Sequence, residues 1–117
     1  MKRKRNSYRS GLFAEFLARM YLRIRGYQIL ARRYVTGRYT GRAEIDIIAK
    51  RGKTIVFIEV KNRPDVVTGL NAVTFDQGVR LRRAAATYLG RHRLTCDARF
   101  DIIVVSGFGI KHFKNAI

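Results

Sequence analysis

The sequence predicts an α/β fold in which helices pack on the faces of a mixed sheet. Apolar residues recur every three to four positions over 10–24 and 76–89, as in helices with one buried face. Runs rich in β-branched and aromatic residues at 27–34, 44–50, 54–62 and 100–105 are typical of strands. The chain has 117 residues, which suits a single hydrophobic core. The predicted order is therefore helix, three strands, helix, strand.

The N-terminal part is expected to hold a basic arm, residues 1–9, ahead of a single domain over 10–117. The first residues are basic and repel one another, so we expect a mobile segment. The first helix is expected to begin at Ser10 and to end before Gly26. Its apolar spacing predicts one buried face, made of Leu12, Phe13, Phe16, Leu17, Met20, Tyr21 and Ile24.

The remaining elements follow from turn signals and periodicity. Residues 35–42 mix glycines and arginines without an apolar period, so we expect a loop there. Arg51-Gly52-Lys53 is expected to turn a hairpin between 44–50 and 54–62, and a polar connection then leads to the helix at 76–89. The run at 100–105 is nearly all apolar, as expected of a strand covered on both faces. Residues 107–113 are expected to add an edge strand.

The charge of the chain predicts a polyanionic partner. Lys and Arg number 25 against 8 Asp and Glu, a formal net charge of +17, and contacts with phosphates release counterions. Nucleic acid is the expected partner. A membrane surface is not expected, because the apolar faces of both helices should cover the sheet. No apolar run reaches the roughly 20 residues of a membrane helix, and we expect a cytoplasmic protein.

The few acids are more informative than the many bases, because three of them lie in the central hairpin. Alternation along a strand places Glu44 and Asp46 on one face, and Glu59 shares a face with Lys61. If Gly52 and Lys53 form the turn, Asp46 lies directly opposite Glu59. A slip of two residues makes them diagonal neighbours instead. In either register the two carboxylates converge.

Two converging carboxylates repel, and a hard cation such as Mg²⁺ compensates for this naturally, because it binds oxygen ligands. Lys61, on the same face, is suited to orient water or to stabilise charge on a phosphate. The pattern therefore indicates a nuclease. The plainer alternative is an exposed ion-pair network in which Glu44 pairs with Lys61 and Asp46 with an arginine. The apolar character of both strands favours the metal site.

Several segments resemble the YraN-like family of predicted endonucleases. They are 11–18, 26–30, 44–49 and 56–61, with further similarity at 72–74 and 100–102, so that the resemblance covers nearly the whole chain. Members of this family look like archaeal Holliday-junction resolvases of the PD-(D/E)xK nuclease superfamily. The resemblance thus implies a restriction-endonuclease-like αβββαβ core, a mixed sheet flanked by helices, and an activity on DNA.

Carried over residue by residue, the resemblance implies that Asp46 and Glu59 bind the metal and that Lys61 is the catalytic lysine. It also implies a metal-binding and catalytic role for Glu15 on the first helix. The alternative for Glu15 is an ion pair with Arg19, one turn further along that helix.

Other residues receive supporting roles. Glu44 is expected behind the metal ligands or against substrate, and Gln77 at the edge of the site. The second helix begins Phe75-Asp76-Gln77-Gly78, without the lysine that the family commonly has there. Contacts with nucleic acid are expected from six residues, namely Arg38, Tyr39, Arg42, Arg63, Arg80 and Arg83.

The expected function is a Mg²⁺- or Mn²⁺-dependent endonuclease that hydrolyses DNA phosphodiester bonds and prefers branched, flapped or junction structures. The alternative is a non-catalytic nucleic-acid-binding module that retains the nuclease fold. RNA remains open as a substrate, and the chain is expected to be a monomer or a homodimer.

Overall fold

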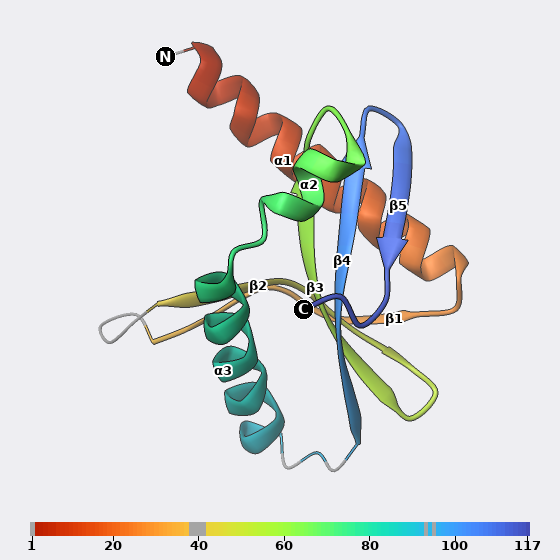
Figure 1. Cartoon of the computed structure of the whole chain (residues 1–117). Helices are drawn as coiled ribbons and strands as arrows, with labels where there is room; N and C mark the ends of the chain where they lie inside the picture. Colours follow the sequence, from red (N-terminus) through yellow and green to blue (C-terminus); the bar gives the residue numbers. More distant parts are fainter. Residues whose placement is uncertain (1, 38–41, 93, 95) are drawn as a thin grey trace.

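The fold is built around one five-stranded sheet with the strand order β1-β2-β3-β4-β5 (Figure 1). The structure is a computed structural model that describes residues 2–37, 42–92, 94 and 96–117. The helices and strands follow one another as α1 (Lys2–Ile24), β1 (Gln28–Thr36), β2 (Ala43–Arg51), β3 (Thr54–Asn62), α2 (Val66–Asn71), α3 (Phe75–Arg91), β4 (Asp97–Ser106) and β5 (Gly109–Phe113).

The sheet is mixed, as predicted. β3 and β4 are parallel, and every other neighbouring pair is antiparallel. A parallel pair needs a crossover connection, which α2 and α3 provide on one face of the sheet. The β2–β3 hairpin turns at Gly52, whose φ of 61° lies in the left-handed region that glycine adopts without strain. The observed order and the helices on both faces are consistent with a restriction-endonuclease-like fold.

The core has two layers, one on each face of the sheet. On the α1 side, Ile47, Val56 and Ile103 belong to a cluster of fully buried residues. On the α3 side, Phe57 packs with helix residues such as Leu81. Figure 1 shows α1 crossing one face while α2 and α3 lie on the other. No helix within the described residues is long and apolar enough to cross a membrane.

α1 differs from its prediction in start and in orientation. It begins at Lys2 rather than Ser10, so the backbone of the expected arm is helical from residue 2 onward. Its fully buried residues are Ala14, Ala18 and Leu22, whereas four residues predicted to be buried are exposed, namely Leu12, Phe13, Phe16 and Ile24. The physical reason is the small alanine side chain, which lets the helix backbone lie close against the sheet.

α2 was not predicted, because 66–71 has no apolar period long enough to indicate a helix. Its start is nevertheless encoded locally: Asp65 is the N-cap, and its side chain accepts a hydrogen bond of 2.8 Å from the Thr68 backbone N–H. Gly69 then brings the helix against β4. A Cβ atom at this position would clash with the Val104 side chain, so only glycine allows this close approach.

β1 carries two irregularities near the site. It pairs with β2 through a register shift between Ile29 and Ala31, and Arg33 has a φ of 53°. Ile45 belongs to the core cluster on the α3 side, and its partner Tyr34 packs against that cluster, where the rings of Tyr34 and Tyr88 are 5.2 Å apart. Strict alternation, which the sequence predicted, places Ile45 on the opposite face with Ile47. β1 also extends to Thr36, into the predicted loop.

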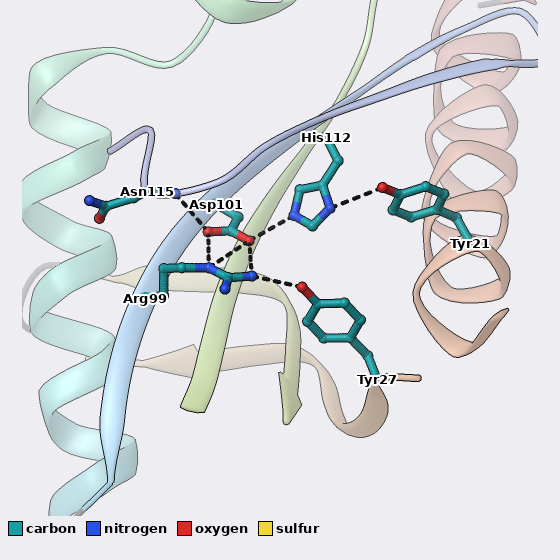
Figure 2. A network of polar contacts seen from close by, with 6 residues as sticks. All are labelled: Tyr21, Tyr27, Arg99, Asp101, His112 and Asn115. Atoms are coloured by element: carbon teal, nitrogen blue, oxygen red, sulfur yellow. Dashed lines mark hydrogen bonds and ion pairs between the residues drawn. The ribbon is translucent and has the colours of Figure 1, made fainter. Parts of the chain in front are cut away.

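A buried network fastens the C-terminal segment to α1 and β4 (Figure 2). Asp101 is fully buried and accepts hydrogen bonds from the Arg99 guanidinium, from His112 Nε2 at 2.7 Å and from the Asn115 backbone N–H at 2.9 Å. Arg99 also donates to the Tyr27 hydroxyl at 2.8 Å, and the Tyr21 hydroxyl lies 3.2 Å from His112 Nδ1. Hydrogen bonds and the Arg99 charge hold the pKa of Asp101 below its usual value despite burial.

Candidate functional site

The central feature of the site is the pair of carboxylates on β2 and β3. The β2–β3 pairing ends at Ile47 and Ile58, and Asp46 and Glu59 are the residues directly beyond this last pair, close to one another as the turn at Gly52 and Lys53 predicted. The Val60 backbone N–H donates a hydrogen bond of 2.8 Å to Asp46 Oδ2 and fixes this side chain. The Glu59 side chain is only 14% exposed. The two acids therefore meet in a largely desolvated place.

Burial and proximity change the protonation of both acids. The pKa of Asp46 is raised to about 8, first because burial disfavours the charged carboxylate and then because the charge of Glu59 lies close. The pKa of Glu59 is also raised, because burial outweighs the nearby Lys61 ammonium. Without a counter-ion the pair is therefore not doubly ionised at neutral pH. A bound cation would allow both carboxylates to be charged.

Lys61 stands beside this pair, as its position two residues after Glu59 predicted. Its Nζ lies 3.3 Å from Glu59 Oε1, and its side chain is 12% exposed. The ammonium is thus held at the site by an ion pair with Glu59. The plainer alternative, in which Lys61 pairs with Glu44 across the strands, does not match this contact.

The acids open onto a cleft of about 360 Å³ between the β2–β3 hairpin and the first turns of α3. Glu44 lines this cleft and is exposed, so it is accessible to solvent and substrate. Arg42 and Arg80 also line the cleft and are exposed. The arginines are placed to contact phosphate oxygens beside the carboxylates, which is the arrangement that a phosphodiester substrate needs.

Gln77 caps the N-terminus of α3 and also lines the cleft. Its side-chain oxygen accepts a hydrogen bond from the Thr74 backbone N–H, and its own N–H donates to Thr74 Oγ1 at 3.1 Å. This capping box starts α3. The side chain that lines the cleft is therefore held in place by the helix end, which fits its predicted position at the edge of the site.

Glu15 is near the site but is not part of the converging pair. Its Oε1 lies 3.0 Å from Nε of Arg33, an ion pair that neither the family resemblance nor the alternative with Arg19 predicted. Its charge contributes to the raised pKa of Asp46. Within the part of the chain that the structure describes, no three His, Cys, Asp or Glu side chains come close enough to form a metal-binding group.

The remaining predicted nucleic-acid contacts are scattered. Arg83 is exposed on α3 and does not line the cleft. Arg63 is half-buried and donates from Nη1 to the Asn62 carbonyl at 2.8 Å, at the end of β3. Arg38 and Tyr39 lie outside the described residues. Two groups were missed by the sequence analysis, the Val60 N–H and Arg33, because a backbone donor and a left-handed residue leave no pattern in the sequence.

Comparison with known proteins identifies the family. The profile of the uncharacterised protein family UPF0102 matches residues 14–105. The chain belongs to this family. The UPF0102 match includes both acids, Lys61 and the cleft, and it stops before β5. The YraN-like resemblance expected from the sequence is confirmed at this level.

Individual UPF0102 proteins match most of the chain. One from Paramagnetospirillum magneticum is 38% identical over 111 residues, which is 92% of this chain and 86% of the relative. One from Methylorubrum populi is 41% identical over 89% of this chain and 82% of the relative. One from Parvibaculum lavamentivorans is 41% identical over 85% and 73%. This UPF0102 chain therefore shares most of its length with these relatives.

Proposed function

We propose that this UPF0102 chain is a metal-dependent endonuclease that hydrolyses DNA phosphodiester bonds, a member of the PD-(D/E)xK nuclease superfamily. The observation that carries the proposal is the pair of largely buried, neighbouring carboxylates on β2 and β3 with an ammonium beside them. Such a pair is costly unless something neutralises it. A fold that keeps it at the mouth of a basic cleft supports a catalytic purpose.

The donor set fits a hard divalent cation. Asp46 and Glu59 offer carboxylate oxygens, and Mg²⁺ commonly takes one or two carboxylates and completes its shell with water and substrate phosphate. A bound Mg²⁺ or Mn²⁺ would polarise the scissile phosphate and activate the attacking water. Glu15, held by Arg33, would act on this site mainly through its charge.

The chain's own residues supply positioning and charge. Arg42 and Arg80 line the cleft and would hold phosphate groups of the substrate. Lys61 would stabilise the negative charge that builds on the phosphate oxygens in the transition state. A chain with a net charge of +17 would gather DNA without reading its sequence. The proposed preference for branched or flapped DNA rests on the YraN-like resemblance. We place this activity in the cytoplasm.

Cleavage of a substrate panel tests the proposal. Wild type with Mg²⁺ or Mn²⁺ should cut flapped or four-way junction DNA, and Asp46→Asn or Lys61→Met should lower the rate about 100-fold or more. Asp97→Asn is the matched control, because Asp97 is an exposed acid at the start of β4. Equal rates for Asp46→Asn and Asp97→Asn would refute the proposal.

One observation favours a second candidate, a nucleic-acid-binding module without turnover. Two residues expected to be catalytic are already engaged, Glu15 by Arg33 and Lys61 by Glu59. In that case the wild type would bind DNA but would cut no member of the panel, and Mn²⁺ would not raise its melting temperature.

A further inference from the structure

We propose that the groove between α1 and β1 binds an unpaired stretch of nucleic acid, with its phosphates on Arg19, Arg23 and Arg32 and a base stacked on Phe16. The proposal rests on the proposed function in that it takes a nucleic acid as the ligand. It adds a second contact surface, which is formed by α1 and β1 and is separate from the cleft beside α3.

The groove has a volume of about 420 Å³ and lies outside the cleft. α1 contributes Phe16, Arg19 and Arg23 to its lining, and β1 contributes residues 29–32. β1 is an edge strand, and the register shift between Ile29 and Ala31 falls within this lining. β-bulges of this kind occur often beside functional sites, where they redirect side chains.

The three arginines gather positive charge and form no ion pair with an acid in the described part of the chain, although the charge of Glu15 acts on Arg19. Across the described ranges of the chain, no carboxylate lies within ion-pair distance of Arg19, Arg23 or Arg32, and Glu15 on the same helix is paired with Arg33. Burial and the charge of Arg32 lower the pKa of Arg19. Like charges held together in this way repel, and a polyanion in the groove would relieve that repulsion.

Protection of the sheet edge does not account for the cluster. Charged residues on an edge strand commonly prevent pairing with another chain, which explains Arg32. Arg19 and Arg23, however, come from α1 and face the groove from the other side. Two elements therefore supply the charge to one place.

Phe16 gives the groove an aromatic surface. It is 45% exposed although it lies on a helix that packs against the core, and the Arg19 guanidinium lies 5.9 Å from the centre of its ring. Aromatic and guanidinium planes beside a basic groove are the usual means of binding single-stranded nucleic acid, because every base can stack on them. Duplex DNA, whose bases are already stacked, would gain little from Phe16.

The ion pair of Glu15 with Arg33 relates the groove to the carboxylate site. Glu15 precedes Arg19 by one helical turn, Arg33 follows Arg32, and the charge of Glu15 reaches Asp46. A nucleic acid bound by both surfaces would lie in the α3 cleft at the carboxylate pair and in the groove at Phe16. This arrangement predicts a preference for DNA in which a duplex meets an unpaired extension.

Binding in EDTA tests the groove separately from cleavage. Fluorescence anisotropy would compare a blunt duplex with the same duplex carrying a single-stranded extension. The double variant Arg23→Gln, Arg32→Gln should weaken binding of the extended DNA about tenfold and lower the slope of log K against log salt by about 1.4. Lys50→Gln with Lys53→Gln removes the same charge at the β2–β3 hairpin, away from both grooves, and should change binding less than threefold.

Phe16 has its own matched pair of variants. Phe16→Leu keeps an apolar side chain and should lose about fivefold in affinity for the extension only, whereas Phe16→Tyr keeps the aromatic face and should bind like wild type. Circular dichroism verifies that each variant is folded.

The outcomes separate this inference from the proposed function. The inference would be overturned, whether or not DNA is cut, if the arginine and lysine double variants lost equal affinity for the extended DNA. It would also be overturned if the arginine variant lost equal affinity for blunt and extended DNA. Absence of cleavage together with the expected binding losses would overturn only the nuclease. Vesicles containing phosphatidylglycerol are a further competitor. If they displace the oligonucleotide from wild type but do not bind the arginine and Phe16 variants, the groove binds lipid and the inference is overturned.

Discussion

Asp46 and Glu59 make the metal-free protein less stable at neutral and alkaline pH. The pKa of Asp46 is raised to about 8, against about 3.9 for an unperturbed aspartate, so the folded chain keeps a proton that the unfolded chain releases between those values. Stability therefore falls as pH rises from about 4 to about 8. A site that costs stability in this way is expected where function requires it.

Asp46→Asn should remove this cost. Its amide can still accept from the Val60 N–H and can donate to Glu59, so we expect the melting temperature in EDTA at pH 8 to rise by about 3–6 °C, on the order of 1 kcal/mol. Added Mn²⁺ should raise the melting temperature of wild type but not of this variant. A lower melting temperature for Asp46→Asn in EDTA, measured by circular dichroism, would contradict the assignment.

The carboxylate pair was predictable from the sequence, and the surroundings of Glu15 were not. The short turn at Gly52 and Lys53 fixes the hairpin register as far as Ile47 and Ile58, so Asp46 and Glu59 came together just beyond it, with Lys61 beside Glu59. The ion pair of Glu15 with Arg33 depends on where α1 lies over β1 and on the left-handed backbone at Arg33. Neither is encoded in a local pattern.

At the scale of elements, the packing of α1 on the sheet is set by small residues. Ala18 is fully buried, whereas Phe16 is 45% exposed. Ala18→Leu should therefore overpack the interface and lower the free energy of unfolding by about 1–3 kcal/mol, measured by urea denaturation. Phe16→Leu should change stability by less than about 0.5 kcal/mol. A larger loss of stability for Phe16→Leu than for Ala18→Leu would contradict this orientation of α1 and would favour the buried face that the apolar spacing predicted.

Elements were predicted well where period and length agree, and poorly where packing decides. The four longer predicted strands and the helix at 76–89 follow from long periodic runs, and the edge strand expected within 107–113 is present as β5, although the structure extends several of the other ends. The buried face of α1 was predicted wrongly, because the prediction assumed that the largest apolar side chains are the buried ones. In the structure the small residues Ala14 and Ala18 face the sheet instead. α2 is too short to show a helical period of apolar residues. Gly69, which packs against Val104 of β4, has no side chain that could contribute to such a period.

At the scale of the whole molecule, the Asp101 network joins α1, β4 and β5 behind the sheet that carries the site. Tyr21 comes from α1, Arg99 and Asp101 from β4, and His112 from β5 (Figure 2). No strong local pattern predicts it, because its members are far apart in the sequence. Its position under α1 means that it also holds the helix on which Glu15 and the arginine groove depend.

The pH dependence of stability should report this network. The pKa of Asp101 is lowered in the folded protein, so its stabilising contribution is complete above the unfolded value, about 3.9, and is lost as pH falls through the lower folded value. Asp101→Asn should therefore cost about 3 kcal/mol at pH 7, because it leaves Arg99 and His112 without their carboxylate, and the difference from wild type should shrink below about pH 4. Asp97→Asn, at the exposed start of β4, should leave stability nearly unchanged at both pH values. Urea denaturation at pH 7 and pH 3.5 checks this, and a difference that stays constant or grows on acidification would show that Asp101 contributes by packing alone and not by its charge.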